Sequence, residues 1–135
     1  MSTALQSRLD LGNRLVAEAA AMALAAYRDP QLRVEQKGPG DLVSDADFSI
    51  ERHLRDAILS AFTHDAIIGE EFGGLQATAS FCWLIDPIDG TVNFARKLGY
   101  FCVSLALLHE GRPVAAWIAD PVQSELFSAG PDRIA

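Results

Sequence analysis

The pattern of apolar and polar positions predicts two helices in the first half of the chain. From about Ser2 to Tyr27, apolar residues recur at near-helical spacing among many alanines, which strongly favour helix. Asp29-Pro30 should end this helix, because proline cannot continue it. A second helix is expected to begin with Ser44 or Asp45 as its N-cap and to end near Phe62. Its apolar face would hold Ile50, Leu54, Ala57, Ile58 and Ala61.

Shorter apolar and alternating runs predict strands in the remainder. These runs are Leu32–Lys37, Ala66–Gly69, Phe81–Ile85, Phe101–Leu108, Val114–Ala119 and Glu125–Ala129. The last three are separated by turn residues and predict an antiparallel meander, whereas the glycine-containing stretch Phe72–Ala79 is expected to be a mobile loop. Helices packed on mainly antiparallel strands indicate an α+β fold. Because we find no repeat or linker, residues 1–135 are expected to form a single domain.

Negative charge is concentrated in the middle of the chain. The net charge is −7, and ten acids but only two bases lie between Asp41 and Asp89. This balance disfavours a nucleic-acid partner, although bound metal ions could still draw a phosphate to the segment. We interpret Glu51 and Asp56 as parts of a solvated helix face. Asp47, taken by itself, would be an ordinary acid that compensates the helix dipole.

Composition also bears on the cellular setting. No apolar run approaches the roughly 20 residues that span a bilayer, so no membrane partner is expected. Charged residues throughout the N-terminal segment argue against a signal peptide. Cys82 and Cys102 lie in apolar strand-like runs, and we interpret them as buried free thiols in a reducing compartment. We therefore expect a cytoplasmic protein.

The most informative segment runs from Trp83 to Phe94 and reads WLIDPIDGTVNF. A buried strand is expected to end at Ile85, where two acids, Asp86 and Asp89, follow on a turn stiffened by Pro87. Two carboxylates on one rigid turn repel each other unless a cation neutralises them. Asp-Pro and Asp-Gly are also ordinary turn dipeptides. An ordinary turn does not explain the buried strand, the spaced acids and a second acidic segment upstream.

The two residues after these acids suggest a partner for the cation. Gly90 permits close approach of the backbone, and Thr91 is a candidate N-cap for a short helix whose N–H groups would favour an anion. A hard divalent cation beside a phosphate site is therefore the chemistry that the segment predicts. The three histidines lack the spacing of zinc ligands and offer no competing centre.

WLIDPIDGTVNF resembles the first signature of the inositol monophosphatase family of Mg²⁺-dependent, often lithium-sensitive phosphatases. The resemblance continues in Asp41–Asp47, Ile68–Glu71 and Ser104–Leu107, and so covers nearly the whole chain in the family's order. It implies the N-terminal portion of a sugar-phosphatase-like fold and the hydrolysis of a small phosphate monoester. Two or three Mg²⁺ ions would be the cofactors, and lithium inhibition would be expected.

The resemblance also implies a set of metal ligands. Glu70, Asp86 and the backbone carbonyl of Ile88 would bind the first ion. Asp86 and Asp89 would bind the second, so that Asp86 bridges the two ions. Two metal ions can stabilise both the attacking and the leaving oxygen in phosphate ester hydrolysis.

Catalytic and substrate-binding roles follow from the same resemblance. Asp47 and the Thr91 hydroxyl would be catalytic, because they would orient or deprotonate the attacking water. The N–H groups of Gly90 and Thr91 would hold the phosphate. The substrate-binding set is then Asp86, Ile88, Asp89, Gly90 and Thr91.

The chain departs from the family's pattern in its length. Family members usually run to about twice this length, and a second signature with a further metal-binding aspartate would follow. The resemblance therefore implies an N-terminal half: a fragment, a truncated product, or a half-site completed by a partner, for example in a homodimer. Inositol 1-phosphate is the leading substrate, and histidinol phosphate is the alternative suggested by Glu70–Gly74. The alternative to an enzyme is a non-catalytic half-domain that binds metal or phosphate.

Overall fold

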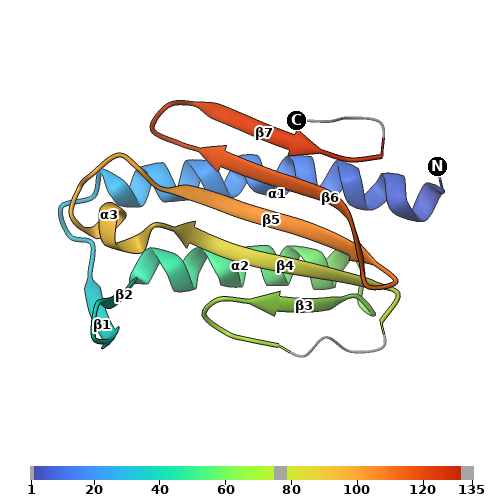
Figure 1. Ribbon diagram of the computed structural model, residues 1–135, viewed down its shortest axis with the longest axis horizontal. Helices are drawn as coiled ribbons and strands as arrows, with labels where there is room; N and C mark the ends of the chain where they lie inside the picture. Colours follow the sequence, from blue (N-terminus) through green and yellow to red (C-terminus); the bar gives the residue numbers. More distant parts are fainter. Residues whose placement is uncertain (1, 75–78, 132–135) are drawn as a thin grey trace.

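A computed structural model describes residues 2–74 and 79–131, so the loop expected at 72–79 lies partly outside the described residues. The elements are α1 (Thr3–Tyr27), β1 (Val34–Gly38), β2 (Asp41–Ser44), α2 (Asp45–Ala61), β3 (Ala66–Gly69), β4 (Phe81–Asp89), α3 (Thr91–Ala95), β5 (Cys102–His109), β6 (Arg112–Asp120) and β7 (Glu125–Ala129). Their arrangement confirms the predicted α+β class (Figure 1).

The main sheet has five strands in the order β3-β4-β5-β6-β7. β3 runs parallel to β4, and every other neighbouring pair is antiparallel, which confirms the predicted meander. The parallel register places Gly69 opposite Ile85. The next residues along the two strands, Glu70 and Asp86, are therefore neighbours at one end of the sheet.

Two long helices cover one face of this sheet (Figure 1). α1 packs against β5 and β6, and α2 packs against β4. The buried layer between helices and sheet includes Trp83 and Trp117, whose ring centroids are 6.2 Å apart. Their indole N–H groups donate to Asp65 and Asn13, respectively, so burial leaves neither indole N–H unsatisfied.

β4 is longer than the sequence suggests, and the prediction that it ends at Ile85, before a stiff turn, is wrong. The strand continues to Asp89, and its pairing with β5 shifts register between Asp86 and Asp89. Pro87 lies in this irregular part, where the strand can do without a ladder N–H. The two acids therefore lie on a bulged strand end. β1 also differs from the expectation, since it begins at Val34.

β1 and β2 form a separate two-stranded hairpin. It lies beside the end of the main sheet where β4 leads into α3 (Figure 1). α3 contacts β2, so the hairpin is packed against this short helix. The arrangement brings the hairpin close to the acids at the end of β4.

Two expectations from composition can be compared with the fold. Cys82 and Cys102 are both free, but only Cys82 is buried, whereas Cys102 is partly exposed. Among the helices of the described residues, none is long and apolar enough to cross a membrane.

Candidate metal and phosphate site

The predicted site residues meet in one pocket at the shared end of β3 and β4. The pocket has a volume of about 230 Å³ and lies between the β1–β2 hairpin, the loop after β3 and the start of α3. Its lining includes every residue predicted as a metal ligand or substrate contact: Glu70, Asp86, Ile88, Asp89, Gly90 and Thr91. Lys37, Asp41 and Glu71 line it as well. Acidic side chains thus outnumber the single lysine.

Asp47 reaches this group from the first turn of α2. Ser44 is the N-cap, and it forms a capping box with Asp47. The Ser44 N–H donates to Asp47 Oδ2 at 2.8 Å, and the Asp47 N–H donates to Ser44 Oγ at 3.3 Å. The second carboxylate oxygen, Oδ1, accepts a hydrogen bond from Thr91 Oγ1 at 3.1 Å. One buried carboxylate therefore both caps a helix and contacts a predicted catalytic residue.

Thr91 does not cap α3, so that prediction is wrong. The N-cap is Gly90, which has a φ of 93°, and no side chain caps the helix. A Cβ at Gly90 would also lie 3.1 Å from the carbonyl oxygen of Tyr100, so this position favours glycine over any other residue. The Thr91 hydroxyl is turned instead toward Asp47 Oδ1 and the carbonyl oxygen of Ile88, at 3.1 Å from each. It links two residues predicted for the site.

Asp86 is the least satisfied acid in the pocket. Its Oδ1 atom is buried and has no hydrogen-bond partner among the residues that the structure describes. Burial is the main reason why the pKa of Asp86 rises to about 7, and the neighbouring charges of Glu70, Asp89 and Asp47 raise it further. A buried carboxylate oxygen without a donor, surrounded by other acids, is suited to a hard cation.

The described side chains do not yet form a closed metal centre. Within residues 2–74 and 79–131, no three His, Cys, Asp or Glu side chains are grouped so that they could share a metal ion. Glu70 and Asp89, which line the pocket beside Asp86, are both exposed to solvent. Since Mg²⁺ keeps several waters, it needs few protein ligands. The residues therefore fit a divalent cation, although they are not preassembled around one.

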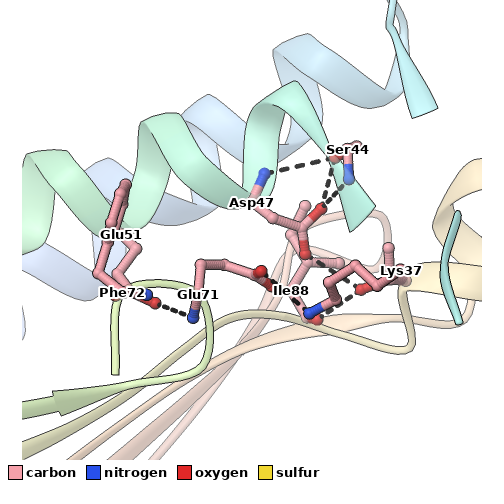
Figure 2. Close-up of polar contacts among 8 residues, drawn as sticks. Lys37, Ser44, Asp47, Glu51, Glu71, Phe72 and Ile88 are labelled. Atoms are coloured by element: carbon pink, nitrogen blue, oxygen red, sulfur yellow. Dashed lines mark hydrogen bonds and ion pairs between the residues drawn. The ribbon is translucent and has the colours of Figure 1, made fainter. Parts of the chain in front are cut away.

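Lys37 is a site residue that the sequence did not reveal. Its Nζ atom lies 3.0 Å from Oε2 of Glu71, whose side chain is only 3% exposed (Figure 2). Burial raises the pKa of Glu71, and the hydrogen bond from Lys37 opposes this shift. The same hydrogen bond raises the pKa of Lys37. A single lysine in a hairpin carries no signal in the sequence, because its position depends on how the hairpin packs.

Glu51 was also misinterpreted, since it does not lie on a solvated face. It is fully buried, and its carboxylate accepts hydrogen bonds from the N–H groups of Glu71 at 2.7 Å and Phe72 at 2.8 Å. Arg55 Nε donates to it at 2.9 Å. The available signal was its spacing, because Glu51 lies three residues before the core residue Leu54 on the apolar face.

Several curated proteins are similar to most of this chain. Nus factor SuhB of Xylella fastidiosa is 43% identical over 98 residues, which are 73% of this chain and 35% of that protein. Inositol monophosphatase of Dictyostelium discoideum is 38% identical over 128 residues, which are 93% of this chain and 46% of that protein. The chain thus spans less than half the length of either relative.

Solved structures match the fold over the same extent. The extragenic suppressor protein suhB of Bartonella henselae has a TM-score of 0.87 and 29% identity, and the match covers 93% of this chain and 50% of that one. An IMPase/NADP phosphatase complexed with Mg²⁺ and phosphate has a TM-score of 0.85 and 22% identity, covering 97% and 50%. These likenesses confirm the expected sugar-phosphatase-like fold.

The family resemblance seen in the central segment extends over nearly all of the chain. The family model described as Inositol monophosphatase family matches residues 4–132. This range includes α1 from its second residue onward, all of α2, the whole main sheet and every residue of the acidic pocket. The chain belongs to the inositol monophosphatase family.

Proposed function

We propose that this chain supplies the metal- and phosphate-binding part of a Mg²⁺-dependent phosphatase for small phosphate monoesters. The observation that carries the proposal is the buried, unpartnered Oδ1 of Asp86. Glu70, Asp89, Asp47 and Glu71 all add to the negative potential at this atom. Such an arrangement destabilises the metal-free protein, and a bound cation would relieve the repulsion.

Mg²⁺ is the ion that suits these donors, because they are carboxylate and carbonyl oxygens. Glu70, Asp86 and the Ile88 carbonyl would hold one ion, and Asp86 and Asp89 would hold a second. An IMPase/NADP phosphatase of the same fold is complexed with Mg²⁺ and phosphate, which supports Mg²⁺ as the ion to test. When bound, the ions would stabilise the negative charge of the reacting oxygens and make a bound water more acidic.

The chain's own residues would handle the proton of the attacking water. The Thr91 hydroxyl donates to Asp47 Oδ1, which leaves its oxygen lone pairs able to accept a hydrogen bond from water. The water proton can then pass to Thr91 as the hydroxyl proton passes to Asp47. The backbone N–H groups of Gly90 and Thr91 would hold the phosphate, and Lys37 contributes a positive charge to the pocket.

Inositol 1-phosphate is the first substrate to test, and histidinol phosphate is the alternative. A second function is binding of metal or phosphate without turnover. It requires only the pocket described above, which is lined by acids and Lys37. The two functions share the same pocket and differ in whether phosphate is released.

The test is phosphate release from inositol 1-phosphate and histidinol phosphate, measured with and without Mg²⁺ and with an Asp89→Asn control. We expect release that requires both Mg²⁺ and Asp89 and is faster with inositol 1-phosphate. Binding of Mg²⁺ by a folded chain without any release would instead favour the binding function. Light scattering on the same sample tests whether the chain forms a homodimer, which a site shared between two copies would require.

A further inference from the structure

We propose that Glu51 is a positioning residue that holds the loop carrying the predicted metal ligand Glu70, with Arg55 as its partner. The inference rests on the proposed function, because it concerns the same metal site. Neither Glu51 nor Arg55 lines the pocket itself. Their effect on a metal ion must therefore pass through the loop between them and the pocket.

The loop after β3 is fixed on two sides by backbone hydrogen bonds. The Glu70 N–H donates to the carbonyl oxygen of Ile85 at 3.1 Å, which ties Glu70 to β4 one residue before Asp86. Gly69 and Gly73 exchange two backbone hydrogen bonds, at 2.9 and 3.0 Å, and close the loop on itself. These bonds fix both ends of the loop but leave its middle, Glu71 and Phe72, to be held by other groups.

Glu51 supplies that third attachment from α2. Its Oε1 atom accepts the Glu71 N–H at 2.7 Å, and its Oε2 atom accepts the Phe72 N–H at 2.8 Å. Arg55 neutralises the carboxylate through Nε, and its Nη2 atom donates to the Gly73 carbonyl. Every hydrogen bond between this pair and the described part of the loop is to the backbone, and the guanidinium carbon of Arg55 also lies 5.9 Å from the centroid of the Phe72 ring. Backbone contacts set the position of the loop without depending on its side chains.

The space at Gly69 shows how closely the loop and this carboxylate fit together. A Cβ at Gly69 would lie 2.3 Å from Glu51 Oε2 and 2.4 Å from its carboxyl carbon. Real side chains do not approach so closely, so the carboxylate occupies the volume that any other residue at 69 would need. The loop therefore begins directly against Glu51.

Residues on one face of α2 thus serve both sides of the pocket, and Figure 2 shows two of them, Asp47 and Glu51. Asp47, Glu51 and Arg55 follow at intervals of four residues, which places them along one face of the helix. Asp47 contacts Thr91, while Glu51 and Arg55 hold the loop with Glu70. The rigid helix therefore fixes the distance between the predicted catalytic pair and the predicted metal ligand. Mutation of a residue that holds a metal ligand in position typically lowers metal affinity by about 10- to 100-fold.

The test is the affinity of the purified chain for Mn²⁺, measured by the spin-resonance signal of the free ion. The main variant is Glu51→Gln. Both carboxylate oxygens of Glu51 accept a backbone N–H. An amide in either orientation would therefore direct its NH₂ group toward one of these donors. We expect the dissociation constant to rise about tenfold. In a Glu70→Gln background the same substitution should change it by less than about twofold, because the two residues act through one path.

Two controls separate positioning from general stability. Asp56→Asn makes the same charge change at an exposed position of α2. Ile58→Val loosens the buried face of the same helix away from the loop. Both should bind Mn²⁺ within about twofold of the parent chain, even where Ile58→Val lowers the melting temperature. If Glu51→Gln fails to fold, Arg55→Gln replaces it, since Arg55 is partly exposed and should weaken binding severalfold.

The possible failures are distinguishable. If folded Glu51→Gln and Arg55→Gln bind Mn²⁺ as the parent does, while Asp86→Asn binds it more weakly, Glu51 is merely structural and the metal site stands. The same conclusion follows if Glu51→Gln raises the dissociation constant for Mn²⁺ by the same factor in the Glu70→Gln background as in the parent chain. If the parent and Asp86→Asn show no difference at any Mn²⁺ concentration, the metal site itself is wrong, and the positioning role is wrong with it.

Discussion

Two carboxylates withdrawn from solvent lie on either side of the same loop, and their surroundings are opposite. Glu51 is fully buried, pairs with Arg55 and accepts two backbone N–H groups. Asp86 has a buried oxygen with no donor, and its charged neighbours Glu70 and Asp89 are acids. One carboxylate is thus satisfied within the chain, whereas the other lacks a partner that only a cation or a proton can supply.

The difference separates scaffold from site. A buried charge with every partner present holds elements together, and removing it leaves the partners unsatisfied. A buried charge without partners reduces stability, and a fold keeps it where another component completes the arrangement. The metal-free chain therefore gains stability from Glu51 and loses stability at Asp86. Substitutions at the two positions should have effects of opposite sign.

The largest expected effect is at Glu51. Glu51→Ala should lower the free energy of unfolding by about 3–4 kcal/mol, because it leaves Arg55 and two backbone N–H groups without their acceptor. Urea unfolding at neutral pH measures this change. Asp56→Ala, at an exposed position of the same helix, should stay within about 0.5 kcal/mol. A loss below about 1 kcal/mol at Glu51 would mean that its buried pair contributes little.

Asp86→Asn should act in the opposite direction. In EDTA at pH 8 it should raise the free energy of unfolding by about 1–2 kcal/mol, because it removes a charge that the folded chain cannot neutralise. This change is smaller than the free energy that corresponds to the whole pKa shift of Asp86, because solvent screens the charge at a partly exposed site. Urea unfolding of the two proteins gives the difference directly. Lower stability of the variant at pH 8 would contradict the proposed repulsion.

The same pair of proteins should show a defined pH dependence. The pKa of Asp86 is about 7 in the folded chain, above its ordinary value of 3.8, so the folded state holds the proton more tightly. Its contribution to stability is fully present below about pH 4 and is lost as pH rises to about 7. The advantage of Asp86→Asn should therefore be near zero at pH 4 and complete at pH 8. A constant advantage across this range would exclude titration of Asp86 as the cause.

The smallest expected effect is at the link between Asp47 and Thr91. Thr91→Val removes the hydroxyl that contacts Asp47 Oδ1 and the Ile88 carbonyl, and should lower stability by about 1 kcal/mol. Thr91→Ser keeps the hydroxyl and should stay within about 0.5 kcal/mol. Thermal unfolding of both variants measures the difference. Equal melting temperatures for Thr91→Val and Thr91→Ser would show that the hydroxyl is not held as described.

Much of the fold and several site residues could be predicted from the sequence, because the patterns that indicate them are local. The helix with its N-cap at Ser44 follows from periodicity and capping, and the meander follows from apolar runs between turn residues. Asp86 and Asp89 stood out because two spaced acids follow a buried strand. The Trp83–Phe94 segment also carried enough of a family signature to assign roles before any geometry was known.

The errors arose where a residue's environment depends on distant parts of the chain. Glu51 resembles a surface residue until the loop after β3 folds against it, and Lys37 enters the pocket only through the hairpin. β4 continues past Pro87 because β5 pairs with an irregular strand end, which local propensity does not encode. Thr91 lost its expected capping role because Gly90 adopts the left-handed conformation and starts α3 instead.

The central claim is that the acidic pocket around Asp86 binds a divalent cation. Calorimetric titration of Mg²⁺ into the metal-free chain at pH 7.5, beside Asp86→Asn, tests it most directly. We expect saturable binding by the parent chain and an affinity at least about tenfold weaker in the variant. Equal heats for the two proteins, or no saturable binding by a folded parent chain, would contradict the claim.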